Sequence, residues 1–415
     1  MKNVRHLLCI NCGKTFQPTP GLYTCDVCGP KLGILDVIYD YAYIKASYNK
    51  KWFAENKDKS IWRYEPFLPL EENGPKPKLR VGWSPLYKTA ALAKEIGLDT
   101  LYMKDDGQNP TASMKDRASA IAVAKALEEG AEVIACSSTG NAASSVAGNG
   151  ASVGMKTVIF VPGRAPQGKV AQLRIFGAQV ISVQGSYEDT FKLSAQAIEK
   201  YGWYNRNAAV NPYLVEGKKT ITIETCEQMD WQVPDWIVFS VGDGCSIAGA
   251  WKGFKDLYDA GFIDKLPKVA GIQAAGCCPL YKCWNEGKGE NWSPDEENTI
   301  ADSIAVGVPR NAVKALRAIN ESNGVWEIAT DEEILDAMRL LGRSSGIFGE
   351  PAGVTGLAGL RNLVKKGVIK ANETVVCAVT GNGLKDVNNA IKAAGEPVKV
   401  DPNINIEDLS KILEA

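Results

Sequence analysis

One lysine carries the most chemical information in this chain of 415 residues. Lys115 lies in segment 109–117, which reads Asn-Pro-Thr-Ala-Ser-Met-Lys-Asp-Arg, between a polar turn and an alanine-rich run over 118–129 that predicts a helix. An amine held at a helix start among small neighbours can form a Schiff base with a carbonyl compound. Most isolated lysines are solvated surface charges, so the interpretation depends on the other motifs.

Three further polar motifs each follow an apolar run that predicts a strand. Residues 137–141 read Ser-Ser-Thr-Gly-Asn, residues 241–246 read Val-Gly-Asp-Gly-Cys-Ser, and residues 380–386 read Thr-Gly-Asn-Gly-Leu-Lys-Asp. Hydroxyl and backbone N–H groups between a strand end and a helix can bind an anion. The glycines of the second motif also let N–H groups converge on a phosphate. Taken singly, the first motif is equally typical of an ordinary helix cap.

The chain has one histidine, His6, which lies among N-terminal cysteines. Ser-His-Asp catalysis, Cys-His catalysis and multi-histidine metal sites all need an imidazole near the chemistry. These site types are therefore excluded for the main body of the chain. Proton transfer there must use a lysine, a tyrosine, a carboxylate or a cofactor.

Taken together and in this order, the motifs resemble those of the threonine synthases, pyridoxal 5′-phosphate (PLP) enzymes of fold type II in the tryptophan synthase β-like superfamily. The segment around Lys115 is similar to Pro-Thr-Gly-Ser-Phe-Lys-Asp-Arg of that family, and residues 380–386 to Thr-Gly-His-Gly-Leu-Lys-Asp. Residues 350–352 and 168–172 match further family segments. The resemblance thus extends over roughly residues 86–386.

The resemblance implies roles for individual residues. Lys115 would carry PLP and shuttle protons, Asn141 would hydrogen-bond the phenolic oxygen of the cofactor, and Thr380 would hydrogen-bond its ring nitrogen. The substrate carboxylate would be held by Ser138, Thr139 and Gly140, and the cofactor phosphate by Gly242, Asp243, Gly244, Cys245 and Ser246. The family loop resembles Val-Gly-Asn-Ala-Gly-Asn, so the carboxylate of Asp243 is a departure. It would repel a phosphate unless it points away.

The implied activity converts O-phosphohomoserine and water to L-threonine and phosphate. The family recognises the phosphate of this small amino-acid substrate with a Thr, an Asn-Ser pair and an Arg, because a dianion needs several donors or cations. Here the matching positions are Ala142, Ala208-Ala209 and Leu214. Cations that could compensate are Arg164, Arg206, Lys218 and Lys219. The alternative is a serine/threonine ammonia-lyase, or a β-replacement enzyme acting on O-phosphoserine that resembles cysteate synthase.

Two cysteine pairs, Cys9-x2-Cys12 and Cys25-x2-Cys28, are typical of the two knuckles of a zinc ribbon. We expect a zinc-ribbon-like segment over residues 1–30 that binds a structural zinc. The alternative is a degenerate ribbon with four free thiols. Some ribbons bind nucleic acid, but no stripe of Lys and Arg surrounds this one.

Composition restricts the location and partners of the protein. A net charge of −1 argues against a nucleic-acid-binding surface over the whole chain. No apolar run is long enough to span a bilayer, and the N-terminus lacks a secretory signal. We therefore expect a cytoplasmic protein, and the resemblance implies a homodimer.

Strands and helices alternate after residue 85, which predicts an α/β fold with parallel sheets. Predicted strands lie at 132–138, 157–161, 179–183, 236–241, 269–273 and 374–379. Ser186 is expected to cap a helix over 187–201, and Thr330 with Glu333 to form a capping box for a helix that ends near Gly342.

The resemblance organises these elements as PLP fold type II, with two parallel-sheet α/β domains behind the ribbon. The expected divisions are the ribbon at 1–30, an aromatic-rich arm at 31–85, a large PLP-binding domain at 86–115 with 215–415, and a small mobile domain at 116–214.

Two other classes of protein compete with the PLP enzyme. One is a non-catalytic protein whose ribbon binds nucleic acid, which the lack of a basic patch disfavours. The other is an enzyme that uses Gly242 and Gly244 as a dinucleotide loop, but Ile247 stands where the third glycine of Gly-x-Gly-x-x-Gly belongs.

Overall fold

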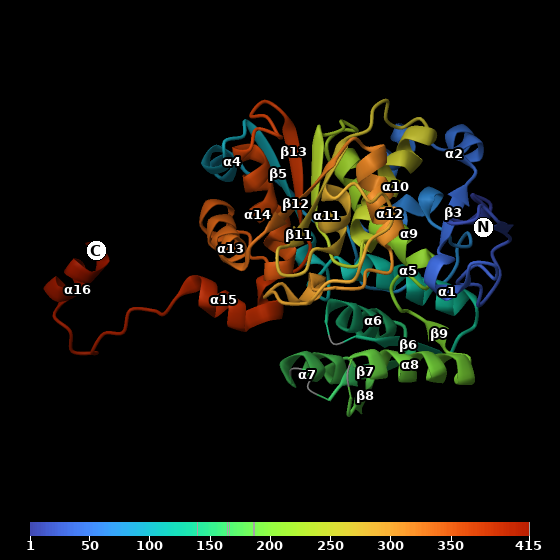
Figure 1. Cartoon of the computed structure of the whole chain (residues 1–415), viewed down its shortest axis with the longest axis horizontal. Coiled ribbons are helices and arrows are strands. Elements are labelled where there is room, and N and C mark those ends of the chain that lie inside the picture. The colour runs from blue at the N-terminus through green and yellow to red at the C-terminus, as the bar shows by residue number, and fades with distance from the viewer. Residues whose placement is uncertain (139, 164, 166, 186, 415) are drawn as a thin grey trace.

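The computed structural model describes residues 1–138, 140–163, 165, 167–185 and 187–414. Its strands form three sheets of six, four and three strands. In Figure 1 the six-stranded sheet occupies the upper body, the four-stranded sheet lies below it, and the N-terminal segment lies at the right. Within the described residues, no helix combines the length and apolar character needed to cross a membrane.

The larger sheet has the strand order β12-β11-β10-β13-β5-β4. All neighbouring pairs are parallel except β4 with β5. The strands are β4 (Leu86–Lys88), β5 (Thr100–Asp105), β10 (Trp236–Ser240), β11 (Lys268–Ala274), β12 (Val325–Ala329) and β13 (Thr374–Val379). The helices of this half are α4 (Ala90–Ile96), α10 (Cys245–Asp259), α11 (Pro279–Asn285), α12 (Ala312–Glu321), α13 (Asp331–Ser345), α14 (Pro351–Lys365) and α15 (Val387–Ala394).

The smaller sheet is parallel throughout, with the order β8-β7-β6-β9. Its strands are β6 (Val133–Ser137), β7 (Lys156–Pro162), β8 (Gln179–Val183) and β9 (Tyr204–Asn205). The helices between them are α6 (Asn141–Ala151), α7 (Gln167–Ile175) and α8 (Tyr187–Tyr201). The last element, α16 (Ile406–Glu414), lies away from the body (Figure 1).

The predicted parallel α/β architecture is confirmed. All six predicted strands are present, and the Thr330–Glu333 capping box starts α13, which continues to Ser345. Ser186, the expected cap of α8, lies outside the described residues. The domain boundaries stay a prediction, although the two sheets use strands from the corresponding parts of the chain.

The N-terminal segment builds a three-stranded antiparallel sheet from β1 (Val4–Cys9), β2 (Thr15–Phe16) and β3 (Leu35–Tyr39). The short helix α1 (Gly29–Leu32) lies between β2 and β3. Helices α2 (Tyr41–Ser47) and α3 (Lys50–Glu55) and the 3-10 segment η1 (Ile61–Phe67) follow β3. Phe53 packs against both Trp231 and Phe262, with ring centroids 5.4 Å apart in each pair. The aromatic segment therefore lies across the main body of the same chain.

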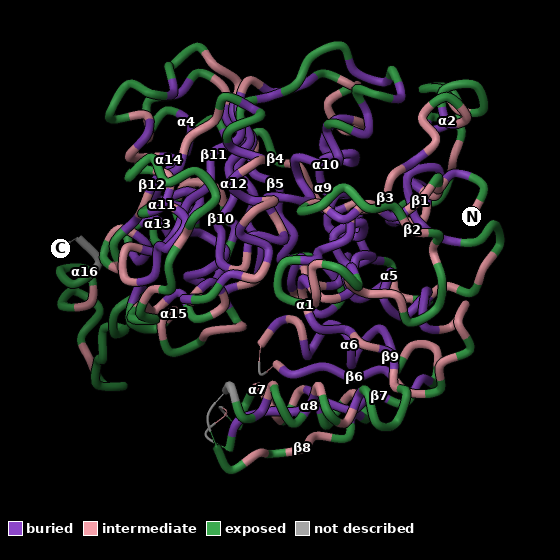
Figure 2. Tube along the Cα trace, turned by 45° about the vertical axis from the view of Figure 1, so that its right-hand side comes forward, coloured by how far each residue is buried: buried purple, intermediate pink, exposed green. Residues whose placement is uncertain are grey.

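Two long helices, α5 (Lys115–Glu128) and α9 (Tyr213–Gln228), run through the interior. Figure 2 shows α9 and α10 as largely buried tubes. A Cβ at Gly217 of α9 would lie 2.1 Å from the Arg117 carbonyl oxygen of α5, so any side chain there would force the helices apart. This close contact sets α9 directly against the first turn of α5.

A buried charge cluster fixes the same turn of α5. The Arg117 guanidinium contacts Asp106 at 2.7 Å and Glu224 of α9 at 2.9 Å, and all three side chains are fully buried. Although burial opposes ionisation of Glu224, Arg117 and Lys104 hold the pKa of its carboxyl at about 2. The Glu224 carboxylate also accepts the backbone N–H groups of Trp83 and Ser84.

Replacement of Arg117 should leave the buried Asp106 carboxylate without a cation and leave Glu224 with Lys104 alone. We expect Arg117→Met to lower the free energy of unfolding by about 3–5 kcal/mol, because the loss of one partner leaves a buried charge uncompensated. Arg343→Met is the matched control, since Arg343 forms an exposed 3.6 Å pair with Glu95 and should cost less than about 1 kcal/mol. Urea unfolding of the two variants measures both values. Equal losses in the free energy of unfolding for the two variants would show that the buried charge cluster does not hold α5 in place.

Candidate active site

The segment before Lys115 is joined to the loop that follows β13. The Met114 N–H donates to the Thr380 carbonyl at 2.9 Å, and the Asn382 N–H donates to the Ala112 carbonyl at 3.0 Å. Ser113 forms an isolated bridge with Gly381 between these two bonds. Two of the predicted motifs are thereby paired strand to strand, so Lys115 begins α5 beside the end of β13.

The environment of Lys115 favours its neutral amine. Burial, and next the nearby Lys218 ammonium, lower the pKa of Lys115 to about 8, while the Glu350 carboxylate opposes the shift and the Arg206 guanidinium adds to it. A lysine with such a pKa can exchange a proton near neutral pH.

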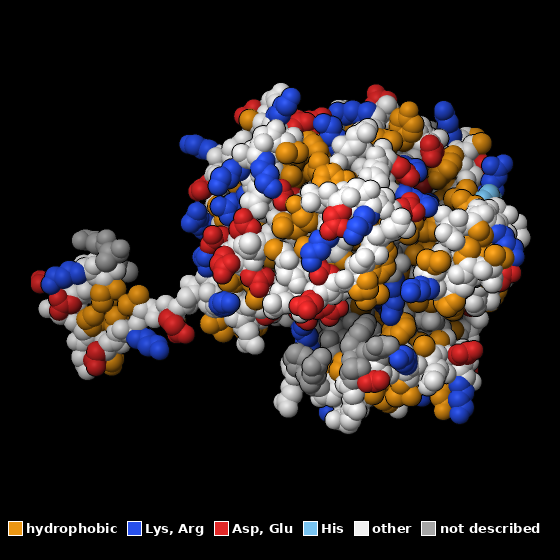
Figure 3. Space-filling view, in the orientation of Figure 1, with side chains coloured by type: hydrophobic (Ala, Val, Ile, Leu, Met, Phe, Trp, Pro, Cys, Tyr) orange, Lys and Arg blue, Asp and Glu red, His pale blue; other side chains and the backbone are white. Residues whose placement is uncertain are grey.

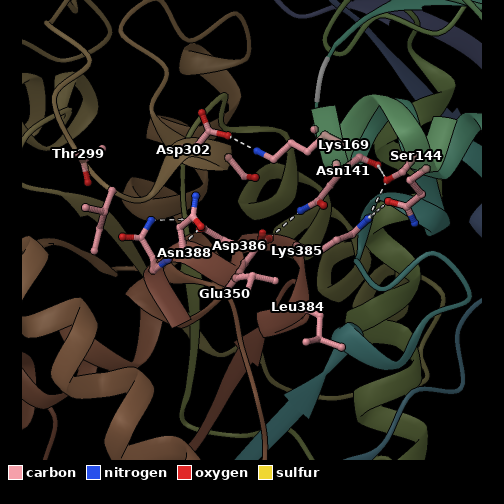
Figure 4. Close-up of a pocket in the computed structure, with 17 residues that line it drawn as sticks. Asn141, Ser144, Lys169, Thr299, Asp302, Glu350, Leu384, Lys385, Asp386 and Asn388 are labelled. Atoms are coloured by element: carbon pink, nitrogen blue, oxygen red, sulfur yellow. Dashed lines mark hydrogen bonds and ion pairs between the residues drawn. The ribbon is translucent and has the colours of Figure 1, made fainter. Parts of the chain in front are cut away.

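Asn141 and Glu350 meet across the space between the two sheets. Asn141 is the first residue of α6, and its Nδ2 donates to Glu350 Oε1 at 2.6 Å (Figure 4). A Cβ at Gly381 would lie only 2.1 Å from the same oxygen, so the carboxyl lies against the loop after β13. Burial raises the pKa of Glu350 to about 6, against the opposing effects of Asn141 and Lys115.

The Gly-rich loop over residues 242–246 connects β10 to α10, and its acidic side chain, Asp243, is bound to a neighbouring segment. Gly244 has φ of 85°, a left-handed conformation that favours glycine. Asp243 Oδ1 accepts the Arg310 backbone N–H at 2.7 Å, and Oδ2 lies 3.4 Å from Cys245 Sγ. The carboxylate thus anchors the loop to a neighbouring segment, which answers the concern about repulsion. The first N–H groups of α10, from Cys245 and Ser246, have no acceptor within the helix and can bind an anion.

The remaining predicted residues lie on the loops after β6 and β13. Ser138 Oγ accepts the Gly140 N–H at 3.2 Å, and Thr139 lies outside the described residues. Thr380 follows β13 and is 9% exposed. The loops therefore come together at the carboxyl ends of strands from both sheets, where α/β proteins bind ligands.

A cavity of about 630 Å³ opens beside Asn141 and Glu350. Its rim carries two contacts between the halves of the molecule (Figure 4). Lys169 of α7 pairs with Asp302 at 2.6 Å, and Lys385 donates to Ser144 Oγ at 2.9 Å. The Glu350 and Lys385 side chains had no role in the sequence prediction, although their segments were matched to the family.

These residues fit PLP. The site offers a lysine with a lowered pKa at a helix start, unpaired N–H groups at the start of a 15-residue helix after a Gly-rich turn, and a hydroxyl residue at the end of β13. They would supply an amine for the aldehyde, donors for the phosphate and a partner for the ring nitrogen.

Residues 78–381 match the family model described as pyridoxal-phosphate dependent enzyme. The chain belongs to this family. It is 41% identical to a threonine synthase of Methanocaldococcus jannaschii over 407 residues, which cover 98% of each chain. It is 43% identical to a threonine synthase of Methanosarcina acetivorans over 401 residues, which cover 96% of this chain and 97% of the relative.

Solved structures share the fold at lower identity. A processed threonine deaminase of Solanum lycopersicum has a TM-score of 0.64 at 22% identity and covers 75% of this chain and 86% of its own. A diaminopropionate ammonia lyase of Escherichia coli has a TM-score of 0.64 at 19% identity, and the match covers 85% of this chain and 91% of the lyase chain. These likenesses show PLP fold type II, as predicted.

Removal of the Lys115 amine should remove the lysine-bound cofactor. We expect Lys115→Ala to lose the visible absorption of that species and to lower turnover by more than about 10³-fold, at the upper end of what a missing proton-transfer group costs. Lys125→Ala, on the same helix, is the control and should keep both. An unchanged spectrum in Lys115→Ala would place the cofactor bond on a different residue.

Proposed function

We propose that this chain is a threonine synthase that converts O-phosphohomoserine and water to L-threonine and phosphate. Similarity to the two archaeal threonine synthases carries the proposal, because it extends over at least 96% of this chain and 97% of each relative. The similarity of the structures above supports only the fold.

In this proposal Lys115 bonds the cofactor, the loop of Gly242, Asp243, Gly244, Cys245 and Ser246 holds its phosphate, and Thr380 faces its ring nitrogen. Bound there, PLP supplies an aldehyde for the substrate amine and a ring that withdraws electrons from the substrate α-carbon. Lys115 moves the α-proton, helped by its lowered pKa of about 8.

Asn141 is proposed to bind the phenolic oxygen of the cofactor. The loop of Ser138, Thr139 and Gly140 is proposed to bind the substrate carboxylate. The 2.6 Å bond from Asn141 to Glu350 keeps the amide turned toward the loop after β13. Glu350 is thereby a positioning residue for Asn141. Closure of a small domain at 116–214 would exclude water, and the Lys169–Asp302 pair links α7 of that part to the larger half.

The alternative activities share the cofactor chemistry but differ in the substrate. Ala142, Ala208, Ala209 and Leu214 offer no side-chain donor to a phosphate. Leu214 packs in an apolar cluster of the smaller half, and Ala209 packs with Cys245. This favours, as second candidates, deamination of serine or threonine and β-replacement on O-phosphoserine.

A product assay separates these activities. We expect the purified enzyme to release phosphate and form threonine from O-phosphohomoserine, with kcat/KM at least about 10-fold above that for O-phosphoserine, the scale on which a fitted pocket distinguishes one methylene group. Ammonia and 2-oxo acid are measured in parallel with serine and threonine. Turnover of these substrates without threonine formation would assign the enzyme to one of the second candidates.

The N-terminal cysteines are proposed to hold one structural zinc. The sulfur atoms of Cys9, Cys12, Cys25 and Cys28 all lie within 4.8 Å of one another. Cys12 Sγ and Cys25 Sγ are 3.7 Å apart, close to the spacing of about 3.8 Å that tetrahedral ligands at about 2.3 Å from zinc would have. All eleven cysteines are free thiols in the structure.

Metal analysis tests this site. We expect about one equivalent of zinc per chain, and loss of the metal in Cys12→Ser or Cys28→Ser because four thiolates complete the coordination. Cys226→Ala, on α9, is the control and should retain the metal. Cofactor absorption should persist in all three variants. Absence of zinc from protein purified under reducing conditions would mean four free thiols.

We further propose a cytoplasmic homodimer that acts on a small amino acid and binds neither nucleic acid nor membrane. The face in Figure 3 intersperses Lys and Arg with Asp and Glu, which supports the absence of a nucleic-acid surface there.

A further inference from the structure

The N-terminal segment is fixed to the larger half of the molecule. The Arg317 guanidinium of α12 donates to the Ile10 carbonyl of the first cysteine knuckle at 2.9 Å. Lys314 of the same helix pairs with Asp36 at 2.7 Å. Buried apolar side chains of the segment, such as Leu7, lie in the same core cluster as side chains of α10 and α12. The segment that carries the four cysteines therefore has a fixed place on this half.

Tyr23 of the same segment reaches the smaller half. Its ring lies edge-on to the ring of Tyr204 in β9, with centroids 5.9 Å apart and planes at 88°. The ring packs against the apolar cluster of the smaller half, in which Ile134 lies. The N–H of Asn205 donates to the Tyr23 hydroxyl at 3.4 Å. The N-terminal segment thus contacts both halves, and Tyr23 supplies the contact with β9.

Strand β9 depends on this contact because it is short and lies at a sheet edge. It has two residues, and in the order β8-β7-β6-β9 it pairs with β6 alone. It lies on the side of the smaller sheet that faces the N-terminal segment (Figure 1). Backbone groups on the open side of an edge strand need another partner. The Tyr23 hydroxyl provides one, and the Tyr23 ring packs on the side chain of Tyr204.

Asn205 connects β9 to the loop after β6. Its Oδ1 accepts the Asn207 N–H at 2.9 Å, and its backbone carbonyl accepts Nδ2 of Asn211 at 2.9 Å. Asn207 Oδ1 in turn accepts the Ser137 N–H at 2.9 Å. Ser137 directly precedes the loop over residues 138–140, for which binding of the substrate carboxylate is proposed. A displacement of β9 would therefore be passed to this loop through two side-chain amides.

We propose that Tyr23 is a positioning residue for the substrate loop, and that the metal-loaded ribbon thereby sets the affinity of the enzyme for its substrate. Tyr23 is two residues before Cys25, the first thiol of the second knuckle, and Thr24 between them forms an isolated bridge with Ile34. A metal held by all four thiolates would fix this backbone, because ligands brought together by a metal order the chain around them. The role of the loop rests on the proposed function, whereas the connection from Tyr23 to Ser137 does not.

The kinetic test uses the holoenzyme and the variants Tyr23→Ala and Tyr23→Phe. Tyr23→Ala should raise KM for O-phosphohomoserine by about 3–10-fold, the scale of one lost aromatic pair. Its kcat should stay within about 2-fold, because the substrate carboxylate is bound alike before and during the reaction. Tyr23→Phe keeps the ring and should retain KM within about 2-fold, since a 3.4 Å hydrogen bond contributes little.

Tyr201→Ala is the matched control. Tyr201 stacks on Trp203 just before β9, with centroids 5.0 Å apart, but its side chain is exposed on α8. This variant removes a ring pair of similar size next to the same strand without touching the N-terminal segment. Its KM should stay within about 2-fold of the wild-type value.

Hydrogen exchange gives a readout that needs no turnover. Tyr23→Ala should speed backbone exchange over residues 203–211 and 133–138, because local opening is governed by local contacts. Exchange over β12, at the far edge of the larger sheet, should not change. An equal increase over β12 would mean that Tyr23 only stabilises the whole fold.

A double-mutant cycle tests the part of the metal. Cys12→Ser, with its loss of zinc confirmed by metal analysis, should raise KM and speed exchange over 203–211 as Tyr23→Ala does. Adding Cys12→Ser to Tyr23→Ala should change neither quantity further, because changes that act through one contact are not additive.

Three outcomes would overturn the proposal. One is unchanged KM and unchanged exchange in folded Tyr23→Ala. Another is the equal increase over β12 described above. The third is an effect of Cys12→Ser that is as large in Tyr23→Ala as in the wild type, since the ribbon would then act by another route. If the wild type turns over serine, threonine or O-phosphoserine in place of O-phosphohomoserine, the proposed function fails, and the same KM comparison is made with that substrate while hydrogen exchange still decides the role of Tyr23.

Discussion

The position of Lys115 depends on a buried arginine two residues after it. Arg117 lies between Asp106, which follows β5, and Glu224 on α9, and all three side chains are excluded from water. None of them can separate without leaving a buried charge unpaired. The first turn of α5 is thus fixed to the larger sheet and to α9 together. This fixes the Lys115 backbone beside the end of β13, which is the rigidity that a cofactor site requires.

The same region contains features that cost stability. Ala112 has φ of 66°, in the left-handed region where a residue other than glycine costs about 1–2 kcal/mol. The family pattern has Gly at this position, and the bonds of residues 112–114 to the loop after β13 hold Ala112 there. Among the described residues, the buried cations Arg206 and Lys218 form no ion pair. Strain and unpaired charge persist where the surrounding structure over-determines them, and they gather at functional sites.

Patterns local in sequence predicted most of the fold and the loops of the site. The six predicted strands were recognisable because they are apolar runs bounded by turn residues. Strand β5, with sequence Thr-Leu-Tyr-Met-Lys-Asp, was missed because its polar end, Lys104, is buried through a contact with Glu224 that only the fold supplies. The orientation of Asp243 toward Arg310 and the bond from Asn141 to Glu350 likewise join segments distant in the chain.

One of the predicted phosphate positions, Leu214, lies on α9, and its packing there accounts for an apolar residue. Leu214 packs in an apolar cluster, where an arginine would lack a partner. Lys218 is four residues later, on the same face of the helix and one turn along it. A cation on this face therefore remains available in this chain, displaced toward the start of α10 and the Lys115 amine. Arg206 approaches the same space from the smaller sheet, so two buried cations act on the Lys115 amine in this chain, although Leu214 stands where the family pattern has an arginine.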